Sequence, residues 1–264
     1  MTLVQAIILA IIEGLTEFLP VSSTGHMIIG SALMGVEPNE FTKLFLIVIQ
    51  LGTILSVLVL YYKRFFQSLS FYFKLVVAAI PASILGVLFN DYIDAALESP
   101  LVVAITLVLG GVLLLFVDKW FNKPKIENIE AVTYKNSFMI GVYQCLALIP
   151  GMSRSASTIV GGMTQGLNRK LAAEFSFFLA IPMMFGASLI KLLKFFKGGN
   201  TFTPEQINLL VVGNIVGFVV AIIAIKFFIG ILTKYGFKAF GWYRIVVGLI
   251  IIAVLASGHE LQII

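Results

Sequence analysis

Two acidic side chains near the N-terminus are the first residues whose type and spacing point to chemistry. Glu13 and Glu17 are four residues apart, so on a helix they share one face. Both lie in an otherwise apolar segment, where a carboxylate is costly unless it meets water, a cation or a base. Oxygen ligands of this kind suit a hard divalent cation such as Mg²⁺ or Ca²⁺. We therefore expect a metal site at this pair, the alternative being two ordinary glutamates near the outer surface.

A proline and three hydroxyl residues follow the acidic pair. Pro20 ends the first helical stretch, and Ser22, Ser23 and Thr24 stand where a second one would begin. These residue types cap helix N-termini, whose free N–H groups and positive dipole bind phosphate. Capping alone needs one hydroxyl, so three beside two acids favour catalysis or phosphate binding. His26, one turn after Ser23, is placed to act as a general acid or base, the alternative being a structural histidine.

A second interruption occurs in the middle of the chain, in the run PGMSRSASTI. Its Arg154 is expected to be the only arginine at membrane depth, and an isolated arginine there should face an anion. A guanidinium can donate two parallel hydrogen bonds to phosphate oxygens. Ser153 and Ser155 can cap a helix or donate to the same anion. The alternative is a structural salt bridge from Arg154 to Glu13 or Glu17.

The composition indicates that both runs belong to an all-α polytopic membrane protein. Hydrophobic residues make up 59% of the 264-residue chain and charged residues 12%, with a mean hydropathy of +1.04. A soluble domain could not cover itself with so few polar side chains. A spanning helix needs about 20 apolar residues. By this measure we expect six spanning helices, at about 43–62, 72–90, 101–117, 172–192, 208–230 and 243–258.

The two interrupted segments, 3–34 and 136–166, have halves too short to span a bilayer. We expect each segment to form a re-entrant helical hairpin. Each half of the chain, about 1–117 and 136–264, then contains one hairpin followed by three spans. This odd number inverts the second half relative to the first, as in many transporters, and brings the two broken tips together near the midplane. The prediction is one membrane domain, 1–264, whose halves are joined by a cytoplasmic loop at about 118–135.

The basic residues set the orientation of this arrangement. The loops 118–135 and 231–244, the second with Arg244, are rich in lysine and arginine and are expected in the cytoplasm. The acidic 91–100 loop and both termini then lie outside. The net charge of +5 is attributed to these cytoplasmic loops, not to nucleic-acid binding. A single cysteine excludes an intramolecular disulfide and a cysteine-cluster metal site, and two histidines exclude a histidine-rich zinc site.

At both interruptions the sequence closely resembles the bacterial undecaprenyl-diphosphate phosphatase family, the BacA/UppP type of bacitracin resistance. The run EGLTEFLPVSSTGH, from Glu13 to His26, looks like the first signature of that family. The run PGMSRSASTI, from Pro150 to Ile159, looks like the second. The resemblance covers the whole chain in length and hydropathy, and none of the acidic, serine, histidine or arginine positions departs from it.

The resemblance implies a metal-dependent enzyme that removes the terminal phosphate of undecaprenyl diphosphate and so recycles the lipid carrier for cell-wall synthesis. It implies that Ser23 is the nucleophile, Glu13 and Glu17 the acidic pair, His26 the proton-transfer residue and Arg154 the phosphate-binding residue. It also implies a bacterial cytoplasmic membrane location, with the active site open to the extracytoplasmic side, and it allows a homodimer. The expected partners are a polyprenyl diphosphate and the bilayer.

The alternative function is a lipid-carrier flippase or an anion transporter, since broken helices in inverted repeats are common in transporters. Transport requires a binding site but no nucleophile. The combination of serine, histidine and paired acids therefore favours an enzyme. The sequence leaves two chemical routes open, attack by Ser23 or attack by an activated water with Ser23 as a ligand.

Overall fold

The computed structural model describes residues 1–66, 69–97 and 99–258, and within them it is helical, with no strand. Its α-helices and short 3-10 helices are α1 (Leu3–Thr16), α2 (Ser23–Leu33), α3 (Glu40–Leu60), η1 (Tyr62–Phe66), α4 (Leu69–Leu88), α5 (Asn90–Leu97), α6 (Pro100–Trp120), η2 (Ile129–Ala131), α7 (Tyr134–Gln144), η3 (Cys145–Leu148), α8 (Arg154–Thr164), α9 (Arg169–Lys197), α10 (Pro204–Tyr235) and α11 (Lys238–Ala256).

Six of these helices are long and apolar enough to cross a membrane, namely α3, α4, α6, α9, α10 and α11. They lie at the six places that the hydropathy of the sequence predicts, so that prediction is confirmed. Large apolar side chains cover their outer faces, and Phe227, for example, is 69% exposed. Such surfaces suit contact with lipid tails better than contact with water. The chain is a multi-pass membrane protein.

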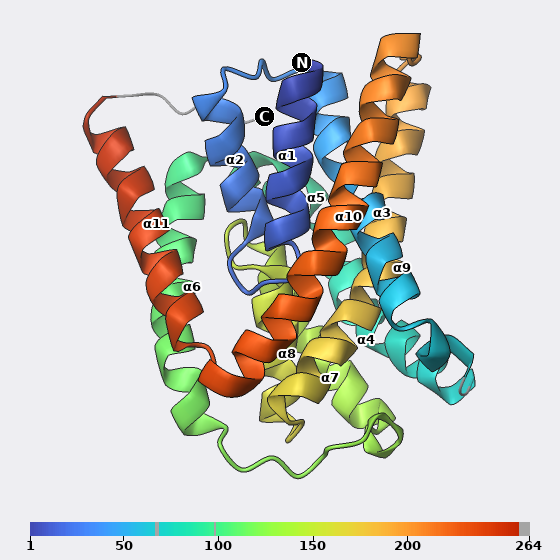
Figure 1. Cartoon of the computed structure of the whole chain (residues 1–264), viewed down its shortest axis with the longest axis vertical. Helices are drawn as coiled ribbons and strands as arrows, with labels where there is room; N and C mark the ends of the chain where they lie inside the picture. The colour runs from blue at the N-terminus through green and yellow to red at the C-terminus, as the bar shows by residue number, and fades with distance from the viewer. Residues whose placement is uncertain (67–68, 98, 259–264) are drawn as a thin grey trace.

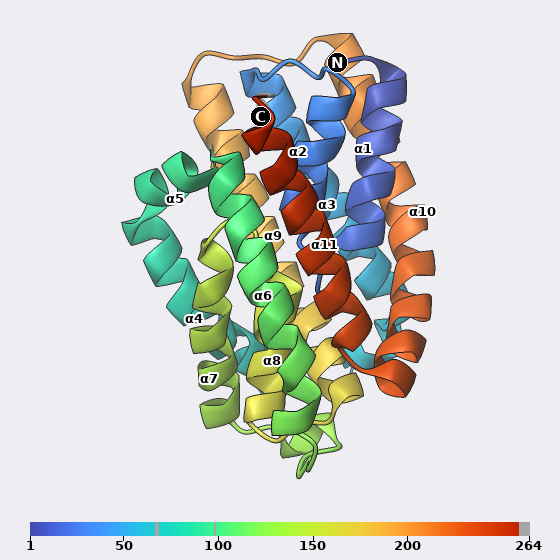
Figure 2. The same ribbon diagram turned by 90° about the vertical axis from the view of Figure 1, so that its left-hand side faces the viewer.

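The two interrupted segments form helical pairs that start from opposite ends of the molecule. In Figure 1, α1 begins at the end where α11 finishes, and α2 returns toward that end. The linker between α6 and α7 lies at the opposite end, from which α7 enters. Figure 2 shows α6 and α11 running side by side. The re-entrance of these pairs into a bilayer and the inversion of the two halves remain predictions.

The tips of the two helical pairs meet inside the molecule. Ser155 Oγ donates a hydrogen bond of 2.6 Å to the carbonyl oxygen of Phe18 in the first break. The second break is fixed to α6, because Thr106 Oγ1 donates to the carbonyl oxygen of Pro150. Gly151 has a φ of +86°, and a Cβ there would lie 2.1 Å from Thr106 Oγ1, so only glycine fits.

Both second half-helices begin with the same unusual backbone geometry. Ser22, before α2, and Ser153, before α8, each have a φ of 70°, which non-glycine residues seldom adopt. Each serine caps its helix: Ser22 Oγ accepts from the N–H of Gly25 at 3.4 Å, and Ser153 Oγ from that of Ala156 at 3.2 Å. The two half-helices therefore start in matching ways, with their N-termini at the meeting point.

Aromatic side chains pack against the first break, the turn between α1 and α2. Phe18 is fully buried and packs edge-on against Phe177 of α9, with ring centroids 5.2 Å apart. Phe177 in turn lies 6.1 Å from the ring of Phe228 in α10. The break therefore packs against α9, which in turn packs against α10 through Phe177.

The structure corrects the prediction of two loops between spanning helices. The segment 91–100 was expected to be a loop, but α5 occupies most of it. No glycine or proline interrupts α5, and Asp91 in its first turn suits the positive end of a helix. Glu98, part of the same expectation, lies outside the described residues.

The expected loop 231–244 is also wrong, because α10 continues to Tyr235 and α11 begins at Lys238. Asp118 stabilises the short turn between them, since its Oδ2 accepts a hydrogen bond of 2.7 Å from the N–H of Phe237. The early start of α11 places Arg244 inside a spanning helix, where it is fully buried. Arg244 therefore lies in a helix and not in a loop, and Arg154 is not the only arginine in the interior of the molecule.

Candidate active site

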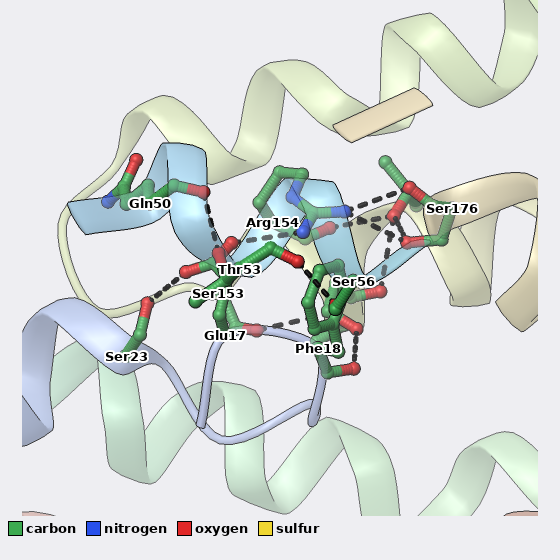
Figure 3. Close-up of polar contacts among 12 residues, drawn as sticks. Glu17, Phe18, Ser23, Gln50, Thr53, Ser56, Ser153, Arg154 and Ser176 are labelled. Carbon is green, nitrogen blue, oxygen red and sulfur yellow. Dashed lines mark hydrogen bonds and ion pairs between the residues drawn. The ribbon is translucent and has the colours of Figure 1, made fainter. Parts of the chain in front are cut away.

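Three of the predicted site residues meet where the two breaks come together (Figure 3). Ser23 Oγ donates a hydrogen bond of 2.5 Å to Glu17 Oε2. The other carboxylate oxygen of Glu17, Oε1, lies 3.0 Å from Nη2 of Arg154 in an ion pair. Glu17 caps the C-terminus of α1, Ser23 is the first residue of α2, and Arg154 is the first residue of α8. The helix ends thus place an acid, a hydroxyl and a cation in one row.

Arg154 already has protein partners on both terminal nitrogens. Nη1 donates to the carbonyl oxygen of Ser176 at 2.9 Å and to its Oγ at 3.3 Å, while Nη2 binds Glu17. The guanidinium carbon lies 5.9 Å from the ring centre of Phe18. Nε is buried and has no partner among the described residues. The salt bridge that was the structural alternative is therefore present, and a phosphate must share these donors or replace their partners.

A cavity of about 280 Å³ opens beside this row of residues. One wall is polar and contains the acid, the hydroxyl and the cation. It is formed by Glu17, Ser22, Ser23, Thr24, Gln50, Ser153 and Arg154. The rest of the lining is mostly apolar and comes from α5, the end of η3 and α9. It is formed mainly by Ile93, Leu97, Leu148, Met183, Met184 and Ala187. A cavity with both kinds of lining suits an amphiphile that has a charged head group and an apolar tail.

The first glutamate of the pair lies deeper than the second. Glu13 has no exposed surface, and neither of its carboxylate oxygens has a hydrogen-bond partner in the described part of the chain. It lies one turn before Glu17, on the same helix face, and does not line the cavity. Glu17 is paired with Arg154, whereas a buried Glu13 requires a cation or a proton of its own.

The donor set fits a divalent cation only in part. The described residues contain no group of three or more histidine, cysteine, aspartate or glutamate side chains that could hold a metal. The two free oxygens of Glu13 and the carboxylate of Glu17 supply hard ligands, and Mg²⁺ usually takes its remaining ligands from water and substrate phosphate. Glu13 does not line the cavity, and both oxygens of Glu17 already have protein partners, so the fit to such an ion stays incomplete.

His26 does not line the cavity. Its Nδ1 lies 2.8 Å from the carbonyl oxygen of Ser22, to which it donates, and its Nε2 lies 2.7 Å from the hydroxyl of Tyr243 in α11. The His26 and Tyr243 rings are stacked with centroids 5.4 Å apart. The structure therefore brings the carboxylate of Glu17 to Ser23 Oγ, and it directs the imidazole to Tyr243.

The remaining predicted residues divide between the cavity wall and the protein interior. Ser22, Thr24 and Ser153 line the cavity, and the first and last of these also cap α2 and α8. Ser155 is fully buried, bonds to the backbone of Phe18 and does not line the cavity, and its expected contact with the anion stays a prediction. It follows Arg154 by one residue, and adjacent helical residues point about 100° apart.

Sequence reasoning missed three residues that shape this site, namely Ser176, Tyr243 and Arg244. Ser176 lies in the run EFSFFLAIPMM, from Glu174 to Met184, which also resembles the family but indicates no role for this serine, and no local motif marks Tyr243 in α11. A signal for Arg244 does exist in the sequence. Gly110 and Gly111 in one span, with Gly241 and Gly248 in another, predict that two helices approach closely enough to enclose a long side chain between them.

Comparisons with known proteins agree with the resemblance seen in the two motifs. The family model described as "Bacitracin resistance protein BacA" matches residues 6–250. The chain is 60% identical to the undecaprenyl-diphosphatase of Flavobacterium psychrophilum and 57% identical to that of Flavobacterium johnsoniae, in both cases over 100% of each chain. It is 44% identical to the undecaprenyl-diphosphatase of Aquifex aeolicus, over 95% of this chain and 97% of the relative. The chain belongs to the BacA bacitracin resistance protein family.

Proposed function

We propose that this protein hydrolyses undecaprenyl diphosphate to undecaprenyl phosphate and inorganic phosphate, and so recycles the lipid carrier for cell-wall synthesis. The observation that carries the proposal is the contact of Ser23 Oγ with Glu17, whose other oxygen binds Arg154. A hydroxyl, a proton acceptor and a phosphate-binding cation are the groups that phosphoryl transfer requires. The names and identities of the relatives support the same substrate.

The shape of the cavity suits a lipid diphosphate. The diphosphate lies against the polar wall, and the first isoprene units lie against Ile93, Leu97 and Met184. The cavity volume of about 280 Å³ holds a head group and a short part of a tail, so the rest of the polyprenyl chain extends into the bilayer. Apolar contacts of this kind do not depend on the chain length of the tail.

Glu17 is the group best placed to accept the proton of Ser23, because their oxygens are already hydrogen-bonded. In the serine route, Oγ of Ser23 forms a bond to the terminal phosphorus, and the bond from that phosphorus to the bridging oxygen breaks. Undecaprenyl phosphate leaves with the electron pair, and water then hydrolyses the phosphoserine to inorganic phosphate. In the rival route, Glu17 takes the proton of a water that attacks directly, and the products are the same.

Positive charge at the two half-helix ends stabilises the transferring phosphoryl group. The N-termini of α2 and α8 both begin beside the cavity, and free N–H groups at such ends bind phosphate. Arg154 adds a guanidinium whose Nε has no partner among the residues that the structure describes. Donors that are fixed before the reaction stabilise a developing charge at little cost in reorganisation.

We propose Glu13 and Glu17 as the residues that hold a divalent cation, Mg²⁺ or Ca²⁺. When bound, the ion would offset the negative charge of the diphosphate. The two oxygens of Glu13, which have no partner within the described ranges of the chain, support this assignment. His26 was expected to transfer a proton. We propose a structural role for it as well, in which its hydrogen bond to the carbonyl of Ser22 stabilises the turn before α2.

A lipid-carrier flippase or an anion transporter is not favoured. Transport does not need a serine hydroxyl bonded to a carboxylate, and the relatives are named for a hydrolase. We further propose a location in the bacterial cytoplasmic membrane, with the cavity open to the extracytoplasmic side and the 118–135 segment in the cytoplasm. A homodimer remains an expectation from the family resemblance.

The test is phosphate release by the purified protein in detergent micelles, with Mg²⁺ or Ca²⁺ present. Micelles have no two sides, so transport cannot produce the signal. We expect undecaprenyl diphosphate to yield one inorganic phosphate per molecule, and undecaprenyl monophosphate to yield none. A protein that binds the diphosphate tightly but releases no phosphate with any divalent ion is a binding or transport protein, and the proposal fails.

A further inference from the structure

Arg244 of α11 connects the two helix breaks from within the protein. None of its side chain is exposed. Its Nη1 donates to the carbonyl oxygen of Met152 at 3.1 Å and to that of Pro20 at 3.4 Å. Its Nη2 donates to the carbonyl oxygen of Gly151 at 2.9 Å. One guanidinium therefore bonds to the backbone of both breaks.

The same guanidinium is fixed to α6. Nη2 also donates to the carbonyl oxygen of Thr106 at 3.2 Å, and Nε to that of Leu107 at 3.4 Å. In the part of the chain that the structure describes, all the hydrogen-bond acceptors of Arg244 are backbone carbonyls. Gly110 makes room for the group, because a Cβ at Gly110 would lie 2.2 Å from Nη2.

A broken helix inside a membrane protein creates the need for such a donor. Carbonyl groups at a helix end have no partner within the helix, and lipid supplies none. Arginine carries five N–H donors in a rigid plane, so one side chain can satisfy acceptors on several segments at once. Lysine has a compact ammonium and cannot reach three segments in the same way.

The bonded carbonyls lie directly before the residues that begin the site. Pro20 is two residues before Ser22, and Gly151 and Met152 directly precede Ser153. Both serines have the unusual φ of 70°, which persists only when the surroundings enforce it. After these serines come Ser23 and Arg154, the first residues of α2 and α8.

We propose that Arg244 is a positioning residue, which holds the two breaks against each other and so sets the placement of Ser23 relative to Arg154 without touching the substrate. It does not line the cavity, which agrees with an indirect role. This inference rests on the proposed phosphatase function.

Two substitutions disturb the contact in different ways. Arg244→Lys keeps the positive charge and removes the planar guanidinium that bonds to three segments. Gly110→Ala keeps the whole arginine and displaces its guanidinium, because the new methyl group would lie 2.2 Å from Nη2. For each we expect kcat to fall by about tenfold to a hundredfold, as for a displacement of reacting groups by about 1 Å. KM for undecaprenyl diphosphate should change by less than about threefold, because phosphate binding does not use Arg244.

Gly230→Ala in α10 is the matched control, since a Cβ at Gly230 meets no atom within 4 Å. It should keep wild-type kcat. The double variant Gly110→Ala with Arg244→Lys completes a cycle. If alanine acts by displacing the arginine, it should cost little once that arginine is absent, so the two losses should not multiply.

The readings are taken on protein that elutes as a single species in detergent and melts cooperatively. Wild-type activity with unchanged kcat in both single variants would overturn the positioning role while leaving the proposed function intact. A large rise in KM with kcat unchanged would show that Arg244 binds substrate. Losses that multiply in the double variant, or folding failure of both single variants, would assign Arg244 to general stability and also reject the inference. An inactive wild-type protein would instead reject the phosphatase itself.

Discussion

Ser23 Oγ donates its hydrogen bond to Glu17 Oε2 at 2.5 Å, and not to the imidazole of His26. The residue that is one helical turn away in sequence is thus not the partner of the serine. Glu17 reaches it across the break, because α1 ends and α2 begins on the two sides of the Pro20 turn. This contact makes the carboxylate the proton acceptor in the proposed reaction.

Replacing Glu17 should therefore cost more than replacing His26. Glu17→Gln removes the proton acceptor of Ser23 and the partner of Arg154, and we expect kcat to fall by about 10²–10⁴, the usual contribution of general base catalysis. Phosphate release at matched amounts of folded protein measures the loss. If the Glu17→Gln variant kept at least a third of the wild-type rate, another group would have to be the base.

The contact of His26 with Tyr243 gives a milder prediction. Tyr243→Phe removes one hydroxyl that bonds to Nε2 of His26 at 2.7 Å and keeps the ring that stacks on the imidazole. Loss of one such hydrogen bond is worth about 0.5–1.5 kcal/mol, so kcat should fall by roughly twofold to tenfold. A fall as large as that of Glu17→Gln would instead show that Tyr243 and His26 take part directly in proton transfer.

Substitution of Glu13 and treatment with a chelator test whether the acidic pair holds a metal. Glu13→Gln keeps the size of the side chain and removes the charge, and amide groups bind Mg²⁺ more weakly than carboxylates do. We expect chelator to abolish wild-type turnover, and Glu13→Gln to need a higher Mg²⁺ concentration for half-maximal rate. Full wild-type activity in excess chelator would contradict the metal assignment. The unpartnered oxygens of Glu13 would then have to be explained by a retained proton.

We expect the contribution of Arg154 to turnover to depend on the shape of its side chain as well as on its charge. Its Nη1 binds Ser176 while its Nη2 binds Glu17, and one ammonium cannot reach both in this way. Arg154→Lys and Arg154→Ala should both lose about 10²–10³ in kcat, as for removal of a strong transition-state donor. Near-normal turnover by the lysine variant would mean that Arg154 only balances the charge of Glu17.

The orientation in the membrane is tested by labelling single cysteines in intact cells, in a Cys145→Ser background. Asp91→Cys in α5 should react with a membrane-impermeant thiol reagent from outside, and Lys123→Cys in the α6–α7 linker only after the cells are broken. Both positions are exposed, so access alone does not separate them. Equal labelling of both from outside would contradict the predicted orientation.

Hydropathy was sufficient to predict the six spanning helices, because a run of about 20 apolar residues has few other uses. The two breaks were also predicted, since Pro20 and Pro150 cannot continue a helix, although α1 already ends at Thr16 and α7 at Gln144. The inverted arrangement and the metal remain predictions.

The partners inside the site could not be predicted in the same way. The place of His26 depends on Tyr243, which lies more than 200 residues away in the chain. Arg244 lies inside α11 because the turn between α10 and α11 has only two residues. Hydropathy alone predicts a longer loop there. Such contacts are set by helix packing, and single-sequence patterns carry little information about packing.

The rate of phosphate release from undecaprenyl diphosphate by wild-type protein and by Ser23→Ala tests the central claim most directly. The alanine variant keeps the backbone of α2 and removes only the hydroxyl that Glu17 accepts from. We predict rapid release by the wild-type protein and no measurable release by Ser23→Ala, with a smaller loss for Ser22→Ala, which removes a cap. If the Ser23→Ala variant, folded and present in equal amount, kept more than about a tenth of the wild-type rate, a barrier change of only about 1.4 kcal/mol, the account of the active site would be wrong.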